Sequence, residues 1–202
     1  VWQRSTFINN PTSSSEYGSV DRIRLRRSAN ATGMKVQQSS SGNAVGSLTN
    51  LRVYRDSTDT NTDAMHFLTQ IESINAVELQ GKTVTFSTRL RLESSFSAAN
   101  VNISINSGTG IDESAQMTSG VFATGNVSFS NLSAVDISIK GTYQIATYTI
   151  NVPSDCTELS LQMQWTPVGS ASDSLDGIRF DYIKLEVGSV ATPYQARPIG
   201  EE

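Results

Sequence analysis

The chain has 202 residues, a formal net charge of −4 at pH 7 and 17% charged residues. This length is enough for one well-buried domain. The 15 basic residues are outnumbered by 19 acidic ones, so general nucleic-acid binding, which needs a concentrated basic surface, is not expected. The apolar runs are too short for a transmembrane helix, and the opening Val-Trp-Gln-Arg contains no apolar signal core. We therefore expect a soluble protein without membrane insertion.

The composition and the hydropathy pattern favour the all-β class. Ser and Thr make up 50 of the 202 residues, which suits the solvent faces of strands and their turns. Apolar and polar residues alternate with period two in turn-bounded segments, as in half-buried strands. We predict one antiparallel β-sandwich of the jelly-roll type, with about ten to twelve strands and little helix. In chain order, strands are expected near residues 20–27, 32–38, 51–55, 64–71, 83–92, 101–106, 121–123, 126–130, 134–139, 143–152, 159–165 and 178–187.

The first of these strands carries three arginines on one face. Arg22, Arg24 and Arg26 alternate with Ile23 and Leu25. An anionic glycan or a phosphate could be bound by this face. The alternative is a solvated strand face on which the arginine stems cover apolar surface.

The segment Asp-Ser-Thr-Asp-Thr-Asn-Thr-Asp follows the strand expected at 51–55. Its Asp56, Asp59 and Asp63 suggest a calcium loop, but the closing Gly and the bidentate Glu of the helical calcium loop are missing. We expect no cofactor and keep Ca²⁺ only as an alternative. His66 follows as the only histidine, and with Cys156 as the only cysteine it cannot build a zinc site.

The middle of the chain holds the clearest alternation. Thr-Val-Thr-Phe-Ser-Thr-Arg-Leu-Arg-Leu, at 83–92, places its arginines Arg89 and Arg91 on the face opposite to its apolar residues. The preceding segment, 69–80, lacks a clean helical stripe and predicts only a short turn.

Two pairs of acids raise the question of polysaccharide cleavage. Asp112 with Glu113 and Asp173 with Asp176 lie in loops rich in Ser and Gly, and a glycosidase needs two carboxylates at a defined separation. Exposed turn acids are the alternative. No Gly-x-Ser-x-Gly motif is present, so we expect a non-catalytic protein and keep a depolymerase fragment as a further hypothesis.

Aromatic residues are the candidates for sugar stacking, because sugars pack their apolar faces on Trp and Tyr rings. Trp165 ends the strand expected at 159–165, in phase with its apolar residues, so core packing is the alternative for this ring. Tyr54 and Tyr148 are further strand aromatics.

The last predicted strand contains a break in its alternation. Its apolar phase changes at Tyr182, which a β-bulge would explain. Gly188 and Ser189 then supply a turn, and two prolines follow. We therefore divide the chain into a sandwich, 1–187, and an extended tail, 188–202, that leaves it. The apolar tail residues Val190, Tyr194 and Ile199 are expected to dock on a neighbouring subunit.

Four segments together resemble a module found at the carboxyl-terminal end of many bacteriophage and prophage tail fibre proteins. They are Val-Trp-Gln-Arg at 1–4, Val-Asp-Arg-Ile-Arg-Leu at 20–25, the segment 78–92, and Leu-Glu-x-Gly-x-x-Ala-Thr-Pro ending at Pro193. The closing motif is the most specific. In the second segment, Ile23 stands where the family has a tryptophan.

The resemblance implies a carbohydrate-binding-module-like jelly roll on a virion fibre, assembled as a homotrimer and contacting further tail fibre segments. It implies attachment to a host cell-surface polysaccharide or lipopolysaccharide, and it transfers no catalytic residue. A structural trimerisation or decoration module without a ligand of its own is the alternative function.

Overall fold

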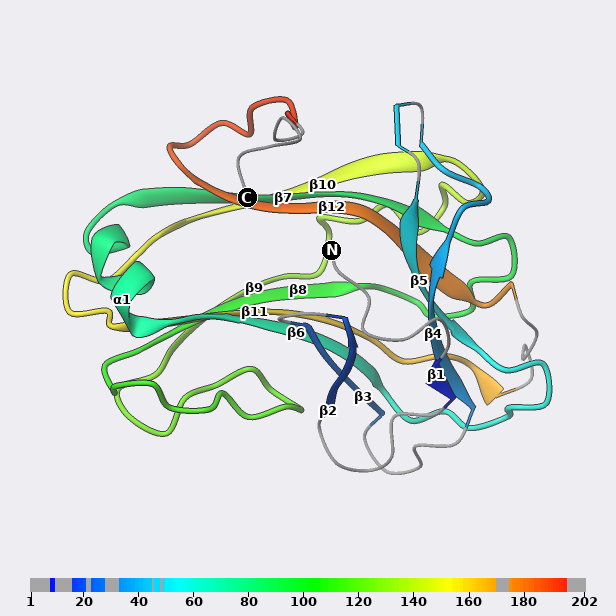
Figure 1. The fold of residues 1–202 in the computed structure, drawn as a ribbon, viewed down its shortest axis with the longest axis horizontal. Coiled ribbons are helices and arrows are strands. Elements are labelled where there is room, and N and C mark those ends of the chain that lie inside the picture. The colour runs from blue at the N-terminus through cyan, green and yellow to red at the C-terminus, as the bar shows by residue number, and fades with distance from the viewer. Residues whose placement is uncertain are drawn as a thin grey trace.

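The structure is a computed structural model that describes residues 8–9, 16–20, 23–27, 33–44, 46–47, 49–169 and 175–195. These residues form two six-stranded antiparallel sheets packed face to face (Figure 1). The sheet that we call upper has the order β1-β4-β5-β12-β7-β10; its strands β12, β7 and β10 run along the top of that view, and β5, β4 and β1 descend at the right. The lower sheet has the order β2-β3-β6-β11-β8-β9. The predicted all-β sandwich is therefore confirmed.

The strands are β1 (Ile8–Asn9), β2 (Glu16–Val20), β3 (Ile23–Arg27), β4 (Met34–Ser39), β5 (Asn50–Arg55), β6 (Met65–Ile71), β7 (Thr83–Leu92), β8 (Asn102–Gly108), β9 (Val127–Asn131), β10 (Tyr143–Asn151), β11 (Glu158–Trp165) and β12 (Gly177–Val187). Between β6 and β7 lie one helical turn, α1 (Ser73–Ala76), and a 3₁₀ turn, η1 (Val77–Leu79). The short turn expected there is thus confirmed. No helix among the described residues is long and apolar enough to cross a membrane.

Two of the predicted strands are wrong. Residues 121–123 and 134–139 form no strand. Their apolar residues are nevertheless buried, because Phe122 packs in a small cluster with Leu68 and Val135 packs in the main core. An apolar residue in a loop that packs on a sheet gives the same local pattern as a strand, and this explains the error.

The core lies between the two sheets and is built from the inward phase of each strand. Val84, Phe86 and Leu90 of β7 are fully buried, as are Ile103 and Met163 of the opposite sheet. Each such side chain contributes about 1.5–3 kcal/mol of burial free energy. Since no disulfide is possible with one cysteine, this core supplies the main stabilisation of the fold.

The bulge predicted in the last strand is confirmed. The register of β12 against β7 shifts between Phe180 and Tyr182, which leaves Asp181 as the extra residue. Before the bulge, Ile178 and Phe180 face the core. After it, Tyr182 lies on the outer side of the sheet and Ile183 packs against the core. The bulge therefore places Asp181 and Tyr182 on the outer face of the sheet, where the site described below lies.

Candidate functional site

The outer faces of the two sheets differ in what covers them. The loop 109–126 lies over the outer face of β6, β11 and β8 (Figure 1). Gln162 donates to the carbonyl of Met117 at 3.0 Å and Gln70 accepts from the amide of Ala115 at 3.1 Å. Phe122 and Met117 pack on Leu68 in a second small apolar cluster. The lower sheet's outer face is thus closed over these strands by the protein itself.

The outer face of β4, β5, β12, β7 and β10 carries the candidate site, which we call the arginine face. One residue from each strand lies in a single cross-strand row: Gln37, Arg52, Arg179, Arg91 and Tyr143. Side chains that stand directly opposite each other on adjacent strands are within contact distance, so like charges at such positions repel each other. A row with three successive arginines therefore needs counter-charges.

Glu93 supplies the counter-charge for two of these arginines. Its carboxylate accepts from Arg52 at 2.7–3.1 Å and from Arg179 at 2.9 Å. The Glu93 side chain is only 4% exposed. Charge-assisted pairs of this geometry are among the strongest hydrogen bonds in proteins. Glu93 thus holds both guanidinium groups in fixed positions.

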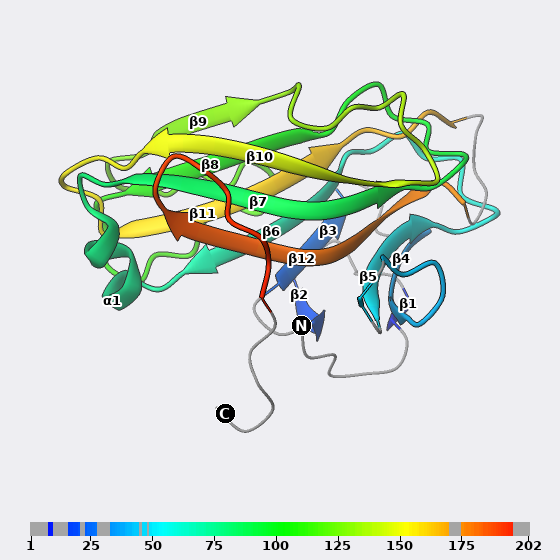
Figure 2. The ribbon, with the colours of Figure 1, turned by 90° about the horizontal axis from the view of Figure 1, so that it is seen from above.

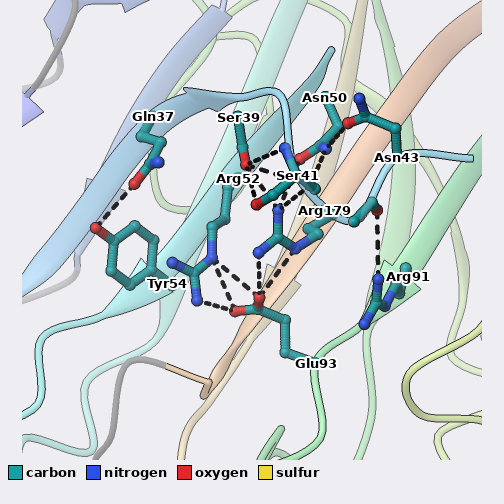
Figure 3. A network of polar contacts seen from close by, with 11 residues as sticks. Gln37, Ser39, Ser41, Asn43, Asn50, Arg52, Tyr54, Arg91, Glu93 and Arg179 are labelled. Atoms are coloured by element: carbon teal, nitrogen blue, oxygen red, sulfur yellow. Dashed lines mark hydrogen bonds and ion pairs between the residues drawn. The ribbon is translucent and has the colours of Figure 1, made fainter. Parts of the chain in front are cut away.

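The loop between β4 and β5 is fastened onto this face from above (Figure 3). Arg179 Nη1 donates to Ser39 Oγ at 2.9 Å and to the Ser41 carbonyl at 2.8 Å. Asn50 Nδ2 donates to the same carbonyl at 3.0 Å, and Arg91 Nη1 donates to the Gly42 carbonyl at 3.3 Å. Gly42 has a φ of +62°, a conformation that L side chains rarely adopt. The sharp turn there brings its carbonyl over β7.

Tyr54 has a supporting role at this site. Its hydroxyl donates to Gln37 Oε1 at 3.1 Å, and the Arg52 guanidinium lies 4.0 Å from its ring centroid. A cation over an aromatic face is attractive by about 0.5–2 kcal/mol. Tyr54 is 7% exposed, so it orients Arg52 rather than offering an open ring to a sugar.

The other end of the arginine face is bordered by the segment after β12 (Figure 2). Arg89 is ion-paired with the bulge residue Asp181. Tyr194 stacks on Tyr182, with ring centroids 4.8 Å apart and planes 6° apart. Thr192 hydrogen-bonds Glu186 through its amide and its hydroxyl, both at 2.7 Å. Segment 188–195 therefore turns back onto its own sheet.

The predicted sugar-stacking aromatics are placed differently. Trp165 is 1% exposed and belongs to the main core, so it has no free ring face. Tyr148 packs against the same core from the inward phase of β10 and donates to the Ser130 carbonyl at 3.2 Å. Of the three, Tyr54 alone lies on the arginine face.

The arginine strand near the start of the chain belongs to the closed side of the sandwich. Arg24 is 6% exposed and donates to Ser114 Oγ at 3.1 Å and to the Ala115 carbonyl at 3.0 Å, which anchors the covering loop. Arg26 is half-buried and pairs in register with His66. Burial and the charge of Arg26 lower the pKa of His66 to about 4. Arg22 lies outside the described residues. The predicted arginine face of β3 is therefore a fastening surface where it is described.

The aspartates considered as an alternative calcium loop have basic partners. Asp59 is buried and ion-paired with Arg27, and Asp56 pairs with Lys35 at 3.0 Å. Among the described residues, Asp56, Asp59 and Asp63 do not lie together as a group of three metal-ligating side chains. Carboxylates already neutralised by arginine and lysine are poor ligands for a cation.

The acids considered for catalysis have structural partners. Asp176 is buried, ion-paired with Arg55 at 2.8 Å and hydrogen-bonded by the amide and hydroxyl of Ser97. The Thr124 hydroxyl donates to the Glu113 carboxylate and lowers its pKa, and the amides of Thr124 and Ala123, which donate to it at 3.0 Å, add to this effect. Asp112 Oδ1 accepts from the Ser73 amide at 3.3 Å. Asp173 lies outside the described residues.

The predicted docking residues of the tail are partly described. Val190 is 73% exposed and Tyr194 is 52% exposed even in its stack on Tyr182. Ile199 lies outside the described residues. The part of the tail that is described thus contacts its own sheet through the Tyr194 ring and the hydrogen bonds of Thr192, and leaves apolar surface open.

Sequence reasoning missed Arg52, Arg179, Glu93 and Tyr143 as one group. Arg52, Arg179 and Tyr143 lie on three strands that are distant in the sequence, and Glu93 directly follows β7. Only the strand order β5-β12-β7-β10 makes these residues neighbours. The sequence signal that could have found the three strand residues is their outward position in the alternation, because polar outward residues on neighbouring strands indicate a shared face.

No family model matches the chain, and no curated protein matches its sequence. Similar folds occur among solved structures. The carboxyl-terminal family 22 carbohydrate-binding module of Clostridium thermocellum Xyn10B has a TM-score of 0.52 and 15% identity, covering 93% of this chain and 99% of its own. A xylan-binding domain of the same family 22 has a TM-score of 0.50, 15% identity and the same coverage.

The enzymatically active domain of bacteriophage CBA120 tailspike protein 4 has a TM-score of 0.50 and 10% identity. The match covers 89% of this chain but 21% of the tailspike chain. At these identities the comparisons establish a carbohydrate-binding-module-like β-sandwich and leave the ligand to the chemistry of the site.

Proposed function

We propose that this domain is a non-catalytic glycan-binding module of a bacteriophage tail fibre that attaches the virion to a host cell-surface polysaccharide. The observation that carries the proposal is the arginine face. One sheet of the sandwich carries a preorganised set of guanidinium, amide and hydroxyl groups from five strands, with the β4–β5 loop fastened onto part of it, while loop 109–126 covers β6, β11 and β8 of the other sheet. Groups with fixed hydrogen-bonding geometry suit the recognition of sugar hydroxyls and acidic substituents.

Three further features support this proposal. The fold is that of carbohydrate-binding modules, and similar solved structures include a xylan-binding domain and a phage tailspike domain. The carboxyl-terminal motif resembles that of tail fibre modules. The acids Asp112, Glu113 and Asp176, considered for catalysis, hold loops and strands together, which favours binding over cleavage.

The proposal includes a homotrimer in the virion fibre. Exposed Val190 and Tyr194 are apolar residues at the end of the sandwich, and closed symmetric assemblies commonly bury such anchors. An adjacent subunit that covers segment 188–195 would also border the arginine face.

The test is to block the arginine face and its opposite surface separately. Ile145 on β10 is 60% exposed next to Tyr143, and Thr118 is exposed on the loop that covers the other sheet. Ile145→Cys and Thr118→Cys are each coupled to a maleimide-linked polyethylene glycol. The native Cys156 should not react, because it is buried and its burial raises the pKa of the thiol.

Binding is then measured on an array of bacterial surface polysaccharides, with release of reducing ends as a second readout. We expect binding without release, lost when position 145 is blocked and kept when position 118 is blocked. Binding that survives the block at 145 would show that the glycan site lies elsewhere. Adsorption of the protein to cells that is unchanged by stripping their polysaccharide would contradict the glycan proposal itself.

A further inference from the structure

The arginine face carries more positive charge than its own acids neutralise. Four arginines lie on it, Arg52, Arg89, Arg91 and Arg179, together with Lys184, against the carboxylates of Glu93, Asp181 and Glu186, of which Glu186 pairs with Lys184. Glu93 is shared by Arg52 and Arg179, and Asp181 pairs with Arg89. This local excess is notable because the whole chain has a net charge of −4.

Among the described residues, Arg91 has no counter-charge within ion-pair distance. The hydrogen bond of its side chain in that part of the chain is the 3.3 Å one from Nη1 to the Gly42 carbonyl. Its Nε is buried and has no hydrogen-bond partner. A guanidinium group cannot lose its proton at physiological pH, so the charge persists. Arg91 therefore keeps unused donors beside two other cationic groups.

Tyr143 is the neighbour of Arg91 in the row, and its side chain also has a buried donor that is not hydrogen-bonded. Its hydroxyl is buried and has no hydrogen-bond partner among the described residues. Burial raises the pKa of this hydroxyl and the charge of Asp181 adds to this effect, while Arg179, Arg91 and Arg89 act in the opposite direction. The hydroxyl thus remains a donor at neutral pH and lies within electrostatic range of the arginine cluster.

Buried donors without acceptors are uncommon in native proteins, because each one loses its hydrogen bonds to water on folding and gains none in return, which costs free energy. Here two such donors are directly opposite each other on adjacent strands. An acceptor placed between them would satisfy both, and an anionic one would also balance the excess charge. A neutral sugar hydroxyl would satisfy the geometry but leave the charge.

We propose that Arg91 and Tyr143 form a subsite for an anionic substituent of the bound glycan, the carboxylate of an acidic sugar or a phosphate group. This inference rests on the proposed function and names its ligand class. The anion accepts hydrogen bonds from the Arg91 guanidinium and from the Tyr143 hydroxyl. The long contact to Gly42, on an exposed turn, is the one that Arg91 gives up to reach it.

The experiment follows the Arg91 Nε–H resonance by nitrogen-15 NMR in the full chain. The signal is assigned by its loss in Arg91→Gln. Glucuronate, glucose 6-phosphate and neutral glucose are added separately at constant ionic strength. We expect a saturable shift with at least one of the two anions and none with glucose. Which anion binds more tightly distinguishes a carboxylate ligand from a phosphate ligand.

Two variants separate this role from a structural one. Tyr143→Phe removes a hydroxyl that has no partner in the fold, so it should leave the unfolding transition unchanged while raising the dissociation constant for the anion about fivefold. Arg26→Gln removes the same charge from the opposite face and should leave binding of the anion unchanged.

The inference is overturned if neither anion shifts the resonance, if glucose shifts it equally, or if Tyr143→Phe binds the anion as well as the unaltered chain. Array binding of neutral glycans together with any of these results would overturn the anionic subsite and leave the glycan-binding proposal standing. A saturable anion shift without any array binding would support the subsite and contradict the proposed function.

Discussion

The substitution Glu93→Gln tests how the arginine face is held together. Glu93 is the shared partner of Arg52 and Arg179, which stand directly opposite each other on β5 and β12. The side chains of the three residues are 4%, 12% and 9% exposed. A neutral amide would leave two largely buried guanidinium groups adjacent and without a counter-charge.

The expected loss in the free energy of unfolding is about 3 kcal/mol. Removing one partner of a buried ion pair costs about 3–5 kcal/mol, because the remaining charge is left uncompensated. The lower end applies here, since the glutamine oxygen still accepts one hydrogen bond and both arginines are partly solvated. With a urea slope of about 2 kcal/mol per molar for a chain of this size, the midpoint should fall by about 1.5 M.

Urea unfolding followed by tryptophan fluorescence measures this change. Glu78→Gln is the matched control, because this substitution makes the same change of charge at an exposed residue of η1, away from the arginine face. The control midpoint should stay near that of the unaltered chain. A loss below about 1 kcal/mol in Glu93→Gln, the range of surface ion pairs, would refute the argument that Glu93 organises the face.

Three further outcomes are expected. The free energy of unfolding should fall by about 3 kcal/mol between pH 7 and pH 4, because the pKa of His66 is lowered from 6.5 to about 4 in the fold and protonation therefore favours the unfolded chain below pH 6.5. The fall should be smaller in His66→Gln. Urea titrations at several pH values measure both chains, and identical pH profiles would contradict the prediction. Phe122→Ala should speed hydrogen exchange in residues 114–121 and leave β7 protected, because Phe122 packs the covering loop on Leu68; uniform acceleration across the sandwich would argue against a separate loop cluster. Truncation after Gly188 should weaken self-association more than it weakens the fold, and light scattering checks this; a full-length chain that is monomeric at micromolar concentration would remove the basis for the trimer.

The sequence predicted those parts of the fold that depend on local phase. The alternation in 83–92 located β7 to the residue, and the phase change at Tyr182 located the bulge of β12. Burial follows from the same phase, which is why the core alternative for Trp165 agrees with its position. The segments 121–123 and 134–139 were mistaken for strands because loop residues that pack on a sheet are apolar too.

The site depends on which strands become neighbours, and alternation holds no information on strand order. Arg52 and Arg179 are 127 positions apart, yet they are opposite each other because β5 pairs with β12. The compact arginine segment at 22–27 attracted attention, but Arg24 and Arg27 are used to fasten a loop and to neutralise Asp59. Local charge density thus pointed to a structural feature, whereas the candidate site is assembled from single outward residues on five strands.

The most direct test of the central claim is to map the bound glycan on the surface of the domain. Backbone amide NMR spectra are recorded while the tightest-binding polysaccharide fragment from the array is added to the labelled chain. We expect the largest shifts in β5, β12, β7 and β10, around Arg179, Arg91 and Tyr143. Largest shifts in β6, β11 and the covering loop 109–126, with the arginine face unaffected, would contradict it.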